Sequence, residues 1–258
     1  MVAQRAGDGY HSAMQRYKLT IEYDGGPFVG WQRQDNGPSV QQALEEAALR
    51  YCGQPVVAHA SGRTDAGVHA LGQVAHLDFD RGDTADKVRD ALNAHLRPHP
   101  VAVVKAEVVD EDFHARFSCI ERSYVYRILN RRSRPALDAG RVWWMSRPLD
   151  AAAMHAAAQE LVGSHDFTAF RAKECQAKSP LKTLDELVVT RRGDEIEVFA
   201  RARSFLHHQV RNMVGTLVMA GEGKWTPAHV RGVLNGRDRA KAGQTAPACG
   251  LYFLRAEY

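Results

Sequence analysis

The chain has 258 residues, of which 45% are apolar and 25% charged, and its formal net charge is +4. This composition is typical of a globular protein with an ample core, and the apolar runs are too short to span a bilayer. Because the start of the chain has no apolar signal segment and the four cysteines contain no C-x-x-C pair, we expect a cytoplasmic protein without a membrane segment, zinc ribbon or disulfide framework.

The N-terminal part of the sequence predicts strands that alternate with helices. Residues 1–16 are polar and predict a disordered leader. Residues 17–23 alternate as in a strand, and Ser39 is a typical N-cap for a helix that ends near Cys52. Further elements are expected as an extended approach at 54–59, a strand at 72–79, a helix at 84–96 and strands at 101–109, 123–129 and 141–145.

A second half begins near Pro148. It predicts a long helix that Ser204 caps and Gly221 closes, with an apolar stripe along one side. The other expected elements are a helix at 151–162, a helical turn at 166–171, a hairpin of strands 184–190 and 195–201, a helix at 226–234 and a strand at 250–258. Both halves, 17–147 and 148–258, mix helices with hairpin-like strands, which favours an α+β fold with helices on a largely antiparallel sheet.

A short loop with several reactive side chains separates two extended runs. The stretch 60–70 reads ASGRTDAGVHA, in which Gly62 and Gly67 flank Arg63 and Asp65. Glycines let the backbone turn sharply, so such a loop can project Asp65 from a rigid sheet, with Arg63 on the same side. The spacing alone fits equally well an Asp65 that caps its own turn beside a solvated Arg63.

The sequence does not predict a metal site. It contains twelve histidines but no H-E-x-x-H motif. His207 and His208 are adjacent rather than one helical turn apart, which is not the usual spacing of two ligands on a helix. We therefore expect no metal site.

Seven motifs in one order, from about residue 17 onward, carry a family resemblance. The central one is GRTDAGVH at 62–69, which resembles the catalytic signature of the TruA family of tRNA pseudouridine synthases. One such motif is weak evidence, but seven in family order are hard to obtain by chance. The other six are YDG through GWQRQ (23–34), DFHARFS (112–118), YVY (124–126), DFT with FR (166–171), FLHH with VRN (205–212) and GLY (250–252).

The resemblance implies a fold, an activity and partners. The implied fold has two RRM-like (ferredoxin-like) halves merged through one central, mainly antiparallel sheet with helices on one face. The implied activity is the isomerisation of uridine to pseudouridine at positions 38, 39 and 40 of the tRNA anticodon arm, by a homodimer without cofactor or metal. The expected order of strands and helices agrees with this fold without establishing it.

The chemistry explains why a carboxylate is needed. Isomerisation breaks the N1–C1′ bond of uridine and joins C5 to C1′, so a group must support the sugar or the base while the bond is open. Asp65 matches the family's catalytic aspartate, and the sequence leaves open whether it attacks C1′ or C6 or removes the C2′ proton. The resemblance further implies that Arg63 orients Asp65 and helps to flip the base. Tyr124 is implied to stack on the uracil and to assist the transfer of the C5 proton.

Further positions are candidates for substrate contacts, and each has a plainer alternative. Trp31 would stack on the RNA or cover the edge of the core, and Arg116 would contact phosphate, the Asp65 loop or solvent alone. The long helix would present a polar face to the RNA or to solvent, and Leu251 would lie beneath the uracil. The candidates are Trp31, Arg33, Arg116, His207, His208, Arg211, Asn212 and Leu251.

Two residues depart from the family pattern. Gln209 follows the paired histidines where an apolar residue is commoner, and Phe253 replaces the commoner leucine of the last motif. Both adjoin the expected site, so they concern the shape of the pocket rather than the chemistry.

Two rival functions come from other classes. A non-catalytic RNA-binding protein with RRM-like halves would not need Asp65 and Tyr124 together. An aspartate-nucleophile phosphohydrolase would need a second acidic residue nearby, as in D-x-D, to hold magnesium, and the Asp65 loop has none. The isomerase is therefore the favoured prediction, and the RNA-binding protein is the alternative.

Overall fold

The computed structural model describes residues 14–258. Residues 1–13 of the predicted leader lie outside this range. The last two residues of that leader, Gln15 and Arg16, belong to the first strand, which therefore begins earlier than expected. Within the described range, no helix combines the length and the apolar character that a bilayer crossing requires.

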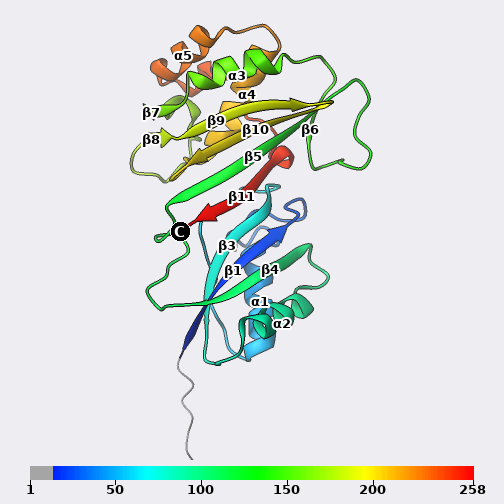
Figure 1. Ribbon diagram of the computed structural model, residues 1–258, viewed down its shortest axis with the longest axis vertical. Coiled ribbons are helices and arrows are strands. Elements are labelled where there is room, and N and C mark those ends of the chain that lie inside the picture. The colour runs from blue at the N-terminus through cyan, green and yellow to red at the C-terminus, as the bar shows by residue number, and fades with distance from the viewer. Residues whose placement is uncertain (1–13) are drawn as a thin grey trace, which may run out of the picture.

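One large, mainly antiparallel sheet runs through the molecule (Figure 1). Its main path is β4-β1-β3-β11-β5-β10-β9, and neighbours on this path are antiparallel except for β3 and β11. Two short strands join at the side, where β2 pairs with β3 and β6 pairs in parallel with β5. The strands are β1 (Gln15–Tyr23), β2 (His59–Ala60), β3 (His69–Phe79), β4 (Val101–Val109), β5 (Glu121–Asn130), β6 (Trp143–Met145), β9 (Glu186–Arg192), β10 (Glu195–Ala202) and β11 (Leu251–Glu257).

The strands of the two halves follow the same spatial order. In the N-terminal half β4, β1, β3 and β2 lie side by side, and in the C-terminal half β11, β5, β10 and β9 do so. If the four strands of each set are numbered by their order along the chain, the spatial order in both sets is fourth, first, third, second. Because β5 pairs with β10 and β11, the chain passes into the second half after β4, and the expected boundary between residues 147 and 148 divides a set of paired strands.

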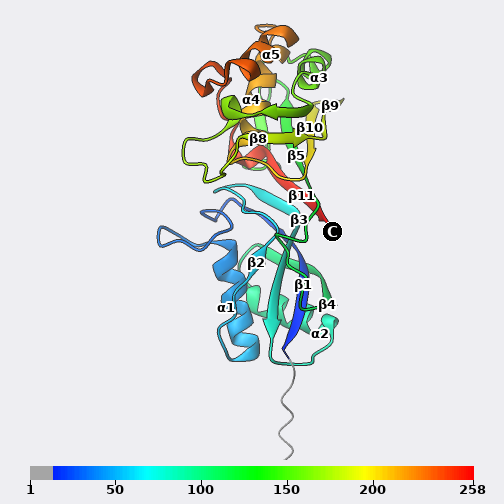
Figure 2. The same ribbon diagram turned by 90° about the vertical axis from the view of Figure 1, so that its left-hand side faces the viewer.

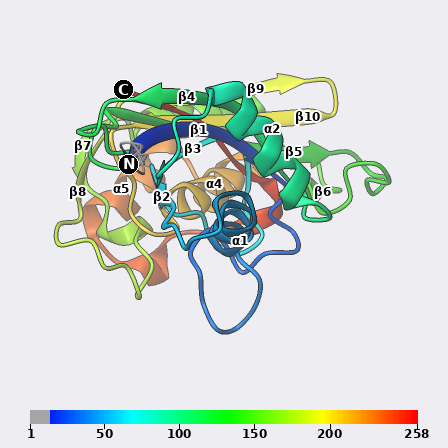
Figure 3. The ribbon, with the colours of Figure 1, turned by 90° about the horizontal axis from the view of Figure 1, so that it is seen from below.

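The described residues form five α-helices, which pack on the sheet in two groups. Helix α2 contacts α1 beside the N-terminal strands, and α3 contacts α4 and α5 beside the C-terminal strands. Figures 2 and 3 show α1 and α4 on the same side of the sheet. The helices are α1 (Val40–Cys52), α2 (Ala85–Leu96), α3 (Ala151–Gln159), α4 (Gln209–Gly221) and α5 (Pro227–Gly236).

The helices of the N-terminal half follow the expected capping and spacing. Ser39 Oγ accepts a hydrogen bond from the Gln42 N–H at the start of α1, and Thr84 Oγ1 accepts one from the Lys87 N–H at the start of α2. These caps satisfy backbone donors that have no partner inside the helix. The apolar residues that recur at helical spacing are all buried: Val40, Ala43, Leu44, Ala47 and Ala48 in α1, and Val88, Leu92 and Leu96 in α2.

The long helix of the C-terminal half begins later than the sequence predicts. Helix α4 starts at Gln209 rather than just after Ser204, and its N-cap, His208, has a φ of 62°. Gln209 accounts for this late start, because its side-chain oxygen accepts the Leu206 N–H while its own N–H donates to the Leu206 carbonyl. This closed turn makes residues 205–208 a bend ahead of the helix instead of its first turn.

The sequence does not predict the small second sheet of the C-terminal half. Strands β7 (Gly163–Asp166) and β8 (Leu181–Leu184) pair antiparallel, and the predicted turn at 166–171 is a 3₁₀ turn over Thr168–Phe170. Both strands are short, and β7 carries no run of apolar or β-branched residues, so neither gives the usual strand pattern.

Candidate active site

The loop of residues 61–68 is fixed against the segment that follows β1. Asp65 forms an isolated bridge with Gly30, and the Trp31 N–H donates to the Thr64 carbonyl at 3.0 Å. The Tyr23 hydroxyl and Thr64 Oγ1 lie 2.7 Å apart in the interior. Gly30 is needed at this contact, because its φ is 113° and a Cβ there would lie 2.6 Å from the Thr64 oxygen. Asp65 is therefore held on a rigid support.

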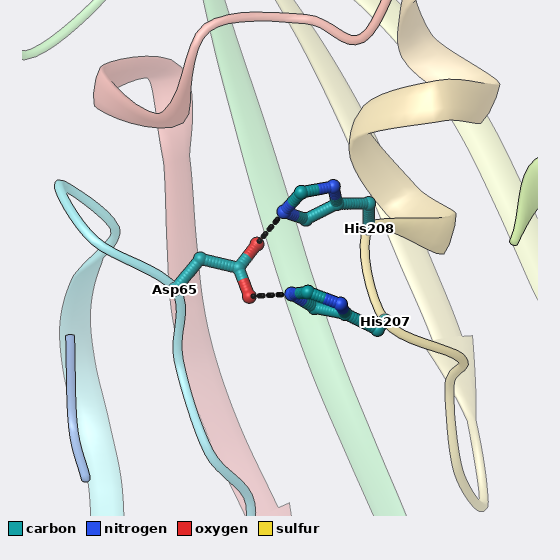
Figure 4. Close-up of side chains that lie close together, drawn as sticks. All are labelled: Asp65, His207 and His208. Atoms are coloured by element: carbon teal, nitrogen blue, oxygen red, sulfur yellow. Dashed lines mark ion pairs between the residues drawn. The ribbon is translucent and has the colours of Figure 1, made fainter. Parts of the chain in front are cut away.

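The carboxylate of Asp65 faces three basic side chains, of which Figure 4 shows the two histidines. His207 Nε2 lies 3.2 Å from Oδ1, His208 Nε2 lies 3.3 Å from Oδ2, and Arg211 Nη1 lies 3.1 Å from Oδ2. Figure 4 shows the two imidazoles approaching from the segment ahead of α4, one toward each carboxylate oxygen. The Asp65 side chain is 21% exposed, so the carboxylate remains open to a substrate. Its partners are side chains, which favours the reactive carboxylate over the self-capped turn.

The bend ahead of α4 brings the two adjacent histidines together. His208 is one of two non-glycine residues with positive φ in the described part of the chain, and its ring centroid lies 4.0 Å from that of His207. Burial lowers the pKa of His208, although the nearby Asp65 charge acts in the opposite direction. The prediction that these histidines line the polar face of a helix is therefore wrong, since both precede its first residue, Gln209.

Arg211 takes the place beside Asp65 that the sequence assigns to Arg63. Its Nε donates to the Ala246 carbonyl at 2.8 Å, which fixes the guanidinium against the carboxylate. Arg63 is exposed and forms no ion pair or hydrogen bond with Asp65 in residues 14–258. The expected orientation of Asp65 by Arg63 is therefore wrong for this conformation, because the carboxylate points toward α4, where other cations surround it.

Tyr124 and two residues of β11 form an apolar and aromatic layer beside Asp65. Tyr124 is 8% exposed, and its ring meets those of Phe205 and Phe253 edge to face, with centroids 5.1 Å away in both pairs. Burial raises the pKa of the Tyr124 hydroxyl, and the Asp65 charge adds to this effect. Leu251 is buried in the same sheet, two residues before Phe253. The departure at Phe253 therefore places an aromatic ring against Tyr124.

Arg122, which the sequence analysis does not identify, connects three segments around the site. It lies in β5 and is 9% exposed. Its Nε and Nη2 donate to the Ser61 carbonyl at 3.1 and 2.6 Å, and Nη2 also donates to the Arg116 carbonyl at 3.0 Å. Nη1 donates to the Arg203 carbonyl, just ahead of the bend that carries the histidines. No local pattern reveals such a residue, because backbone carbonyls as partners leave no motif.

Arg33 and Arg116 are exposed, and neither contacts Asp65 among the described residues. Arg33 Nη1 lies 3.4 Å from Glu45 Oε2, and the Arg116 guanidinium lies 5.7 Å from the ring centroid of Phe117. The structure thus leaves both arginines on the surface, where contact with RNA phosphate stays a prediction.

Two histidines fix the segment that carries Arg116. His76 Nδ1 accepts the Ala115 N–H at 3.1 Å, and His114 Nδ1 accepts the Arg116 N–H at 3.1 Å. Burial, together with nearby positive charges, lowers the pKa of His76 to about 4. The ring therefore stays neutral near pH 7 and keeps an acceptor nitrogen for this backbone contact.

Trp31 and Asn212 are buried rather than presented to a substrate. Trp31 is 2% exposed and belongs to the core. The expected stacking on RNA is therefore wrong, and the alternative that Trp31 covers the edge of the core is correct. Asn212 is 1% exposed, and its Nδ2 donates to the Phe170 carbonyl at 2.8 Å. Its Oδ1 accepts bonds from Arg239 and Thr245 at 2.9 and 2.7 Å. The predicted RNA contact of Asn212 is therefore also wrong, because both ends of its amide are already bonded internally.

Comparisons with known proteins show the family to which the chain belongs. The sequence matches the family described as tRNA pseudouridine synthase over residues 19–118 and 157–258. A protein named tRNA pseudouridine synthase A from Rhodospirillum rubrum is 66% identical over 245 residues, covering 95% of this chain and 88% of the relative. Proteins of the same name from Rhodospirillum centenum and Paramagnetospirillum magneticum are 65% and 63% identical over 95% of this chain, covering 100% and 96% of those relatives. The chain therefore belongs to the tRNA pseudouridine synthase family.

Proposed function

We propose that this protein isomerises uridine to pseudouridine in tRNA and that Asp65 is its catalytic carboxylate. The observation that carries the proposal is the placement of Asp65, on a rigid loop, within 3.1 to 3.3 Å of Arg211, His208 and His207. A carboxylate that remains partly exposed beside an aromatic layer is suited to act on a flat base and its sugar. The names of the relatives support tRNA as the substrate.

The reaction needs what this site offers. The N1–C1′ bond breaks, C5 forms a bond to C1′, C5 loses its proton and N1 gains one, so atoms and electrons balance without water or a redox partner. Asp65 attacks C1′ or C6, or it removes the C2′ proton, and each of these roles requires the ionised carboxylate. Arg211 Nη1 donates a charge-assisted hydrogen bond to Asp65 Oδ2 at 3.1 Å, and His207 and His208 Nε2 lie 3.2 and 3.3 Å from the carboxylate oxygens.

Tyr124 is proposed to contact the uracil and to assist the proton transfer from C5. Because burial raises the pKa of its hydroxyl, Tyr124 stays protonated near pH 7 and acts as a hydrogen-bond donor or proton relay rather than as a tyrosinate base. Leu251 and Phe253, from β11, complete the apolar surface against which the flipped base lies.

The Tyr124→Phe variant is expected to bind tRNA but to turn over about 100-fold more slowly, the lower end for a lost proton-transfer group. Single-turnover rates and tRNA affinity should be measured together. The matched control is Tyr51→Phe, which removes a hydroxyl that bonds Asp83 on a different part of the protein. Wild-type turnover by the Tyr124→Phe variant would reduce Tyr124 to a packing residue.

The finer substrate assignment is the anticodon arm, at the uridines of positions 38, 39 and 40. A uridine in or beside a stem must leave the stack before Asp65 reaches it, which costs a few kcal/mol. We propose that Arg63 enters the space that the base vacates, and its exposure two residues before Asp65 supports this role. We further infer two RRM-like halves, supported by their matching strand order, and a cytoplasmic homodimer.

The decisive experiment is to incubate the purified protein with unmodified tRNA and to map pseudouridine with a base-specific chemical adduct. Signals at positions 38 to 40 are the expected result. Signals confined to another part of the tRNA would contradict the anticodon-arm assignment and leave the isomerase intact. Binding without any pseudouridine would instead favour the non-catalytic RNA-binding protein.

A further inference from the structure

The residues around the catalytic carboxylate also have the composition of a metal site. The side chains of Asp65, His207 and His208 each offer a ligand atom, and these atoms all lie within 4.8 Å of one another. Two imidazoles and one carboxylate form a common ligand set for first-row transition metals, with further positions left for water. His207 and His208 are adjacent in sequence, which is not the usual spacing of two metal ligands on a helix. The bend at His208 nevertheless brings both rings to Asp65.

We propose that Asp65, His207 and His208 bind a divalent transition-metal ion, Zn²⁺ above others, and that the metal-bound protein is inactive. The first part is a statement about binding alone. The second part rests on the proposed function, because it requires Asp65 to be the group that acts on uridine.

The distances between the ligand atoms fit zinc. With Zn–N bonds of about 2.0–2.1 Å and Zn–O bonds of about 2.0–2.2 Å, two ligands of a tetrahedral ion lie roughly 3.3–3.4 Å apart. Asp65 Oδ1 lies 3.2 Å from His207 Nε2, and the ligand atoms of all three residues lie within 4.8 Å of one another. Small side-chain movements would therefore bring one carboxylate oxygen and both imidazoles to the separations that a zinc ion requires. The side chain of His207 is 38% exposed, that of His208 27% and that of Asp65 21%, so an ion can reach the site from solvent.

The charges around the site allow a cation to bind. Arg211 opposes one, since its Nη1 lies 3.1 Å from Asp65 Oδ2. A carboxylate has two oxygens, so Oδ1, on the side of His207, is available to the ion while Oδ2 keeps Arg211. Glu174 adds a negative charge that acts on His208 and partly offsets the arginine.

The consequence of metal binding is competition with the substrate. An Asp65 oxygen bound to Zn²⁺ no longer attacks carbon or accepts a proton, and the ion occupies the space between the bend and the loop. Zinc would then inhibit by binding the free enzyme, and raising the tRNA concentration or adding a chelator would restore activity. When no ion is present, both histidines remain beside the carboxylate.

The test uses untagged, chelator-treated full-length protein without RNA, with Co²⁺ as a visible probe and Zn²⁺ as its competitor. We expect one equivalent of Co²⁺ to produce an absorption band that Zn²⁺ abolishes. His207→Asn and His208→Asn should each weaken Zn²⁺ binding at least about tenfold. Mutation of a residue that only supports a metal ligand already costs about 10- to 100-fold in affinity, and loss of a ligand itself should cost no less. The matched control is His229→Asn, an exposed histidine on α5, which should bind like wild type.

Two outcomes would overturn the proposal or one part of it. Equal Zn²⁺ affinity in wild type and both bend variants, with folding confirmed by circular dichroism, would overturn the site. Asp65→Asn serves as a second variant, because it keeps both rings and replaces only the carboxylate ligand. Binding without inhibition of pseudouridine formation would overturn the second part alone. Because the Co²⁺ band is read without RNA, it reports on the metal site even if the proposed isomerase activity is absent.

Discussion

Asp65→Asn is expected to lower pseudouridine formation by at least about 10⁴-fold, a loss typical of removing a central catalytic group. The amide keeps the shape of the side chain but cannot act as a nucleophile or a base. The measurement is a single-turnover assay with unmodified tRNA and enzyme in excess. Because one negative charge is removed next to three basic side chains, tRNA affinity should be equal to that of the wild type or tighter.

The control for this variant is Asp80→Asn, which neutralises an exposed carboxylate just after β3. Its turnover should match that of the wild type. Turnover by Asp65→Asn within tenfold of the wild-type rate would remove Asp65 from the mechanism. A loss of tRNA binding in the same variant would point to a structural role of the loop instead.

Arg211→Met should lower turnover about 10- to 100-fold with little change in KM. The variant loses a charge-assisted hydrogen bond at a side chain that is only 14% exposed, an interaction of roughly 1.5–3 kcal/mol. Arg211→Lys should recover only part of the rate, because an ammonium cannot hold both the Asp65 carboxylate and the Ala246 carbonyl in the geometry of the guanidinium. Steady-state kinetics on the three proteins separates kcat from KM.

Arg231→Met is the matched control, since Arg231 also pairs with a carboxylate, Glu160, at 2.8 Å in another part of the C-terminal half. It should leave turnover unchanged. If Arg211→Met lost no more activity than Arg231→Met, the ion pair with Asp65 would have no catalytic part.

The sequence predicts best what neighbouring residues decide among themselves. The cap at Ser39 and the two helices expected up to Cys52 and over 84–96 are local features, and the structure reproduces them. The position of the loop around Asp65 is also predictable, because two glycines lie within it and an extended run flanks it on each side. The resemblance then selects Asp65 from among the acids of the chain, which composition and periodicity do not.

The environment of Asp65 could not be predicted in the same way. Arg211 follows Asp65 by 146 positions, and the two meet only because β11 and β5 bring the halves together. Arg63 is near in sequence and so was the natural candidate for the ion pair, but proximity along an extended chain does not fix where a long side chain points. The bend at His208 depends on the side chain of Gln209, which a helical pattern does not reveal.

The burial of Trp31 and Asn212 could not be predicted from the sequence either. Trp31 and Asn212 are residue types that often contact RNA, yet the first fills the core and the second bonds three internal partners. Residue type alone does not distinguish these uses, because an indole or an amide is suited to both. Arg122 is the converse case, an arginine in a strand whose importance appears only when its carbonyl partners are known.

The position of β11 has a consequence for how the protein is made. This strand lies between β3 and β5, and its residues 251–257 are synthesised after all the other described strands. Until they arrive, β5 lacks the partner that pairs with its residues 121–126, and β3 lacks its partner at His69 and Ala70, so each half-sheet has an open edge there. Such edges pair readily with strands of other chains, so the newly made protein is most vulnerable to aggregation just before its last strand inserts. The insertion that closes both edges also brings the aspartate loop and the histidine bend face to face.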